Sequence, residues 1–130
     1  MQAVGVLYHS SAITLAMSNE VWNEILVPYL RRNEAWWKEI PEAKPGQGNP
    51  YLKPIWVPGL VNIRGGSLFV CHNAIEDFAY GAADAPKESP QRVHAAIMAG
   101  IVPGALVVPS GVMAINACQE KRFTYIQSSV

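Results

Sequence analysis

The sequence predicts one three-layer α/β/α domain with a mainly parallel sheet. Short, continuous apolar runs fill the expected strands, which is typical of parallel strands that are buried on both faces. Segments with helical spacing alternate with these runs, as in α/β folds. The chain has 130 residues, half of them apolar, which is enough for a single core. We therefore expect one domain over residues 1–130.

The first half of the chain supplies one strand and one helix. Ala3–Leu7 is a short apolar run that predicts a buried strand, and His9-Ser10-Ser11 then provides polar turn residues. From Ser11 to Leu26 apolar residues recur with helical spacing. Pro28 weakens the helical pattern beyond that point.

A segment rich in Pro, Gly and Trp follows, near residues 31–65. Half of all prolines and half of all glycines lie between Pro41 and Gly66, together with aromatic residues that can pack. This composition predicts an ordered insertion, such as a lid or an oligomer contact, rather than a flexible linker. Trp22, Trp36, Trp37 and Trp56 could form a binding surface, but a core and a subunit interface explain them slightly better.

The second half is expected to alternate strands and helices. Ser89 before Pro90 has the pattern of an N-cap with Pro at the first helical position, and Gly100 is well placed to end that helix. The expected elements are strand Gly66–Cys71, helix Ala74–Ala83, helix Pro90–Ala99, strand Ala105–Val108, helix Val112–Arg122 and strand Phe123–Gln127.

Composition excludes several classes of function. The formal net charge is zero, so no overall field attracts nucleic acid or an acidic membrane. No apolar run approaches the roughly 20 residues of a membrane helix. Neither a G-x-G-x-x-G fingerprint nor a P-loop occurs, so no nucleotide cofactor is expected. With no signal peptide visible we expect a cytoplasmic protein, or a periplasmic one if the chain is a processed form.

The two cysteines predict neither a disulfide framework nor a metal site. Cys71 and Cys118 belong to no CxxC pair or zinc-ligand spacing. His72 beside Cys71 is a lone histidine next to a lone cysteine, which does not make a metal site. Cys118 is expected to pack in the core. His94 is expected at the surface or the boundary of its helix.

Candidate site residues follow the expected strands. Ligands of open parallel sheets bind beyond the carboxyl ends of the strands, where the sequence has His9, then Cys71, His72 and Asn73, and later Ser110. If the first two of these strands are neighbours, His9 and Cys71 approach each other. Ser110 lacks the G-x-S-x-G pattern of a nucleophile and is better suited to capping a helix.

Cys71 is the residue best placed for chemistry. At a strand end and a helix start, exposed backbone N–H groups support a thiolate, which is the nucleophile in sulfur transfer. The alternative is that Cys71 packs as a small, buried hydrophobe.

Two segments resemble the DsrE/DsrF-like family of sulfur-relay proteins. They are Leu68–Ala74, which contains Cys71, and Val102–Val112 with Gln119 and Tyr125-Ile126. His9–Trp22 is more loosely similar to a single-domain branch. The resemblance implies a flavodoxin-like fold, a homotrimer or homohexamer, and a cysteine that carries persulfide sulfur between partner proteins. Only Cys71 matches that cysteine, and the segment from Pro41 to Gly66 departs from the family pattern.

The first hypothesis is therefore a sulfur carrier, or a sulfurtransferase-like protein, in which Cys71 takes sulfur from a donor protein and passes it to an acceptor. His9, His72 and Asn73 would stabilise the thiolate or orient the donor. The alternative is a non-catalytic oligomeric protein that binds a small ligand or metal in a rim pocket lined by His9, Cys71 and His72. A purely structural subunit gains weight if Cys71 is buried.

Overall fold

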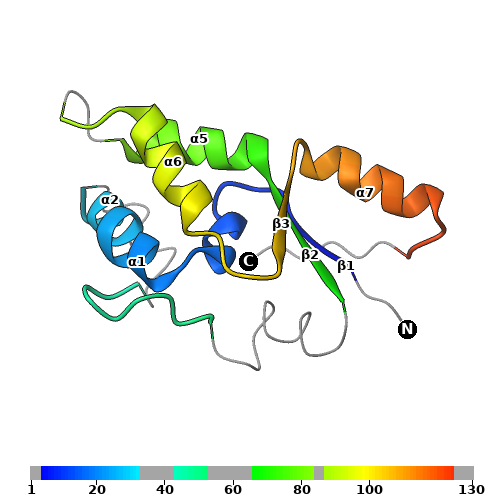
Figure 1. Cartoon of the computed structure of the whole chain (residues 1–130), viewed down its shortest axis with the longest axis horizontal. Helices are drawn as coiled ribbons and strands as arrows, with labels where there is room; N and C mark the ends of the chain where they lie inside the picture. Colours follow the sequence, from blue (N-terminus) through cyan, green and yellow to red (C-terminus); the bar gives the residue numbers. More distant parts are fainter. Residues whose placement is uncertain (1–3, 33–42, 53–65, 84–86, 125–130) are drawn as a thin grey trace.

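The computed structural model describes residues 4–32, 43–52, 66–83 and 87–124. Within these residues three strands form one open, all-parallel sheet (Figure 1). Their order is β1 (Val4–Leu7), β2 (Ser67–Cys71) and β3 (Ala105–Val108), so β2 is central. The expected strands are confirmed, except for the last one.

Helices cover both faces of the sheet, which confirms the α/β/α, flavodoxin-like class. α7 (Gly111–Glu120) packs against β1 and β2 on one face. The chain crosses from β1 to β2 and from β2 to β3 in the same direction across the sheet. Right-handed crossovers then place the helices of both connections on one face, opposite α7. The helices on that other face are η1 (Ala12–Ala16), α1 (Asn19–Val21), η2 (Trp22–Leu26), α2 (Val27–Arg32), α5 (His72–Ala82) and α6 (Pro90–Ala99).

The predicted helix over residues 11–26 is broken into unlike turns. It begins as the 3-10 turn η1, restarts at α1 with Ser18 as the N-cap, and widens into the π-helical turn η2 before α2. The Val27 N–H donates to the Trp22 carbonyl, five residues back. A π turn next to Pro28 relieves the clash between a proline ring and the carbonyl four residues earlier. The helix therefore runs through Pro28 to Arg32.

Trp22 lies in the core and not at an interface. Its side chain is fully buried, and its indole Nε1–H donates to the Thr14 carbonyl at 2.8 Å. The indole N–H is thus satisfied while the ring fills the core. Trp36, Trp37 and Trp56 lie outside the described residues.

Part of the Pro/Gly-rich insertion is ordered against these helices. The Asn49 side chain is buried and its amide donates to three carbonyls, those of Thr14, Leu15 and Met17. The preceding Gly48 donates its N–H to the Asn23 side chain at 2.8 Å. Residues 43–52 are therefore fastened to the first helices, whereas 33–42 and 53–65 lie outside the described residues.

The boundaries of α6 are those expected. The Ser89 side chain accepts from the Arg92 N–H, Pro90 is the first helical residue, and Gly100 follows the last turn.

The last helix is shorter than predicted. α7 ends at Glu120, because Arg122 adopts a positive φ of 68° that no helix can continue. Phe123 and Thr124 form no strand, so the predicted strand Phe123–Gln127 is wrong in its first two residues, and the rest of it lies outside the described residues.

Candidate functional site

The carboxyl ends of the three strands meet at one edge, as expected for a parallel sheet. In the register of the sheet Leu7 pairs with Val70, and Cys71 pairs with Val108. The first two predicted strands are therefore neighbours, and the residues that follow them share this edge.

Cys71 stands at the centre of this edge. It is the last residue of β2 and also the N-cap of α5, an eleven-residue helix. Its thiol is free of any disulfide, and only 5% of the residue is exposed. Cys71 is thus adjacent to the free N–H groups of a helix start, in a nearly buried position.

The first turn of α7 covers Cys71. A Cβ added at Gly111 would lie 3.1 Å from the Cys71 Cβ and 2.5 Å from the Tyr8 Cβ. Real side chains do not tolerate the shorter of these separations, so only glycine allows α7 to begin this close to the strand ends. The start of α7 is therefore packed directly against Cys71.

The other predicted rim residues take separate roles. His9 is exposed and turns to its own loop, where its Nδ1 lies 2.8 Å from the Ser11 Oγ. Ser110 is the N-cap of α7 and accepts from the Met113 N–H at 3.4 Å, which confirms the capping role expected for it. Asn73 is exposed on the first turn of α5.

His72 forms a cluster that the sequence did not predict. Its Nε2 lies 2.9 Å from the Nε2 of His94, with the two rings edge-on at 87°. Its Nδ1 lies 3.9 Å from a Glu76 carboxylate oxygen. One ligand atom from each of the three residues can be chosen so that all lie within 4.8 Å of one another. Such a set of imidazoles and a carboxylate matches the ligands of transition metals.

Sequence reasoning missed His94 and Glu76 as site residues. His72 and Glu76 stand four residues apart on one helix, a spacing that places them on the same face and was visible in the sequence. His94 comes from α6, and its half-buried position beside His72 depends on how α5 and α6 pack, which local patterns do not encode.

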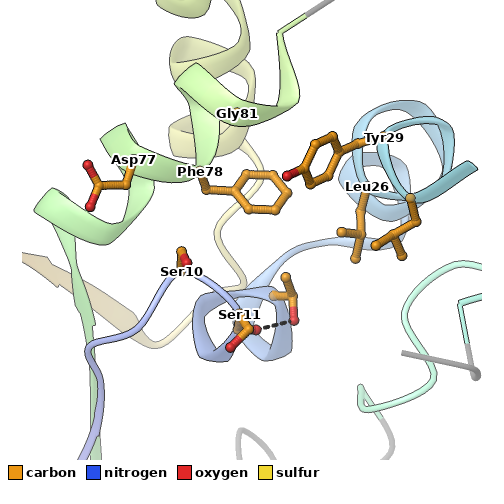
Figure 2. Close-up of a pocket in the computed structure, with 9 residues that line it drawn as sticks. Ser10, Ser11, Leu26, Tyr29, Asp77, Phe78 and Gly81 are labelled. Atoms are coloured by element: carbon orange, nitrogen blue, oxygen red, sulfur yellow. Dashed lines mark hydrogen bonds between the residues drawn. The ribbon is translucent and has the colours of Figure 1, made fainter. Parts of the chain in front are cut away.

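A small pocket lies between the loop after β1 and the helices α2 and α5 (Figure 2). Its volume is about 170 Å³, and the Tyr29 and Phe78 rings meet edge-on at one side of it with centroids 5.6 Å apart. Ser10 and Ser11 line its opposite side, where the Thr14 hydroxyl donates to the Ser11 carbonyl. Its lining residues are Ser10, Ser11, Thr14, Leu26, Tyr29, Leu30, Asp77, Phe78 and Gly81.

Cys118 is not a core residue. It lies on α7 with intermediate exposure and is also a free thiol. Of the residues that form α7, only Gly111 is buried, so the expected core packing of Cys118 is wrong.

Among the residues that the structure describes, no helix is both long enough and apolar enough to cross a bilayer. No family model matches the sequence, and comparisons with curated proteins and with solved structures find no match either. The fold and the geometry of the site are therefore the grounds for assigning a function.

Proposed function

We propose that the protein is a sulfur carrier of the DsrE/DsrF type, with Cys71 as the residue that holds the sulfur. One observation carries this proposal: Cys71 ends the central strand and caps the eleven-residue helix α5. Backbone N–H groups at a helix start favour negative charge, and both the thiolate and the persulfide anion are negative. The sequence resemblance to the family points to the same cysteine.

The chemistry is a thiol–persulfide exchange. The Cys71 thiolate attacks the outer sulfur of a donor persulfide, R–S–SH, and a new S–S bond forms while the donor S–S bond breaks. The donor leaves as the thiolate R–S⁻, so electrons balance without an added oxidant. An acceptor thiolate takes the outer sulfur by the same step in reverse. The protein then acts as a shuttle between two partner proteins.

The test is intact mass after exposure to a low-molecular-weight persulfide. In a Cys118→Ser background we expect the mass to rise by one sulfur atom, and we expect Cys71→Ser to remove that gain completely. Because Cys71 is nearly buried and Cys118 is not, a bulky alkylating reagent should modify Cys118 faster than Cys71.

Two results would contradict the proposal. One is equal sulfur loading of Cys71→Ser and the wild-type chain. The other is a wild-type chain that gains sulfur only on Cys118. Both variants should keep the wild-type circular dichroism, since a serine differs from cysteine by one atom.

A second candidate function is the binding of a small ligand, and the pocket of about 170 Å³ favours it. Ser10 and Ser11 line the pocket together with Asp77 and two aromatic rings. This volume is below the roughly 300 Å³ of ordinary ligand sites, so the ligand would be a small molecule. Ligand-dependent stabilisation with an inert Cys71 thiol would favour this function over the carrier.

The assembly and the compartment belong to the same proposal. A homotrimer or homohexamer is supported by exposed apolar side chains on β3 and α7, namely Leu106, Val112 and Met113. A reducing compartment such as the cytoplasm is supported by two free cysteines.

A further inference from the structure

We propose that His72, Glu76 and His94 bind a divalent first-row transition-metal ion between α5 and α6. Zn²⁺ is the reference ion, because imidazole nitrogens and carboxylate oxygens are its ordinary ligands. This site is separate from sulfur transfer and does not require a persulfide on Cys71. It uses two of the three histidines in the chain.

The two histidine Nε2 atoms fit an ion after a small adjustment. Two nitrogens bound to one tetrahedral zinc ion lie about 3.3 Å apart, given Zn–N bonds of about 2.0–2.1 Å. The Nε2 atoms of His72 and His94 are 2.9 Å apart, so the pair must open by a few tenths of an ångström. The Glu76 side chain is 53% exposed, so it can turn toward the ion without repacking the core.

The backbone holds the three ligands in place. His72 and Glu76 lie one turn apart on α5 and share a face. His94 stands on α6 beside Val93, and both Val93 and Ile97 of that helix are fully packed in the core. α6 is also capped by Ser89. Ligands on two packed helices are preorganised, which lowers the entropy lost on binding.

Charge explains why Glu76 belongs to the set. His72 is the first residue of α5, and the positive end of a helix dipole opposes a cation there. The Glu76 carboxylate, 3.9 Å from the His72 ring, supplies the compensating negative charge. With three protein ligands the ion keeps at least one coordination position for water or for another molecule.

The alternative for the same geometry is a hydrogen bond between two neutral imidazoles. One ring would donate its Nε2–H and the other would accept, with the 87° angle between the rings unchanged. Such a pair responds to no metal. A metal titration therefore separates the two interpretations directly.

The experiment is a titration of the metal-free protein with Zn²⁺ by calorimetry and with Co²⁺ by absorption. We expect one ion per chain, and a loss of affinity of at least about 10- to 100-fold in His72→Gln and in His94→Gln, since even outer-sphere partners of a metal site have effects of that size. Glu76→Gln should also weaken binding. His9→Gln is the matched control, because His9 is an exposed histidine outside the cluster, and it should bind as the wild type does.

Three outcomes would overturn the site. They are the lack of Zn²⁺ and Co²⁺ binding by the wild-type chain, equal weakening by His9→Gln, and a thiolate-to-cobalt charge-transfer band that disappears in Cys71→Ser. Circular dichroism checks that each variant is folded. If a histidine variant does not fold, Glu76→Gln still tests the site, because Glu76 is exposed. Cys71→Ser should lose sulfur loading and keep metal binding, so the two proposals can fail separately.

Discussion

Gly48 illustrates how much one residue determines in this fold. It has a φ of +69°, and a Cβ added there would overlap the Asn19 side chain. That same Asn19 accepts the N–H of Asn49 at 2.9 Å, and Asn49 in turn fastens the insertion to the first helices. Gly48 therefore meets two demands at once, a left-handed backbone and a close approach.

Gly48→Ala should destabilise the protein by about 2–4 kcal/mol, as the sum of the left-handed penalty and the overlap with Asn19. Gly46→Ala is a matched control, because Gly46 has a φ of +71° but nothing within 4 Å of an added Cβ. It should cost only about 1–2 kcal/mol. Urea denaturation measures the free energy of unfolding of both variants. Equal losses of stability would show that the contact with Asn19 contributes nothing.

Sequence reasoning succeeded for residues whose role is local. Ser89 and Ser110 cap helices because a hydroxyl reaches an N–H three residues on, and that geometry needs no tertiary contact. It failed for His94, whose partner is 22 residues away. The position of Cys71 at a strand end was predictable from the sequence. The packing of Gly111, from α7, against Cys71 was not.

At the scale of elements, the end of α7 has an unusual residue. Arg122 takes the left-handed conformation, the Phe123 N–H donates to the Cys118 carbonyl, and the Arg122 N–H donates to the Gln119 carbonyl. This is a Schellman C-cap, in which glycine is the preferred residue. The sequence offers no glycine there, which is why the pattern predicted a helix that continues to residue 122.

Arg122→Gly should stabilise the protein by about 0.5–1 kcal/mol, because it removes the strain of a left-handed arginine. Lys121→Gly is the control: Lys121 has a φ of −88°, so glycine there relieves no strain and only adds entropy to the unfolded chain. Thermal unfolding should show a higher Tm for Arg122→Gly and a lower Tm for Lys121→Gly. A lower Tm for both would show that the arginine side chain stabilises this end.

The regular strands and helices were largely predictable from the sequence, and the irregular turns were not. Buried parallel strands and a capped helix such as α6 have strong local patterns. The π turn η2 depends on how Pro28 is accommodated within a packed helix, and proline in a sequence normally predicts a helix end. Local patterns alone therefore did not fix where the helix ends beyond Leu26.

At the scale of the whole molecule, apolar surface remains on the α7 side. The exposed fractions are 65% for Val112 and 73% for Met113, while Leu106 on β3 is 58% exposed. Exposed apolar residues close in sequence are typical of contact surfaces between proteins.

If this surface joins copies of the chain, the double variant Val112→Lys, Met113→Lys should dissociate the oligomer into monomers, since like charges at an interface repel. Light scattering coupled to size-exclusion chromatography measures the mass. Tyr80→Lys is the control, because Tyr80 is 67% exposed on α5, away from α7, and it should leave the mass unchanged. A wild-type chain that is monomeric contradicts the proposed assembly.

The direct junction between β2 and α5 has a mechanical consequence. Because Cys71 belongs to both elements, no loop acts as a hinge between them, and α5 cannot tilt without pulling the central strand out of register with its two neighbours. β3 and α7 are instead connected by a short linker, Pro109-Ser110. Motion that uncovers Cys71 is therefore expected on the α7 side, while α5 and its histidine stay fixed to the sheet.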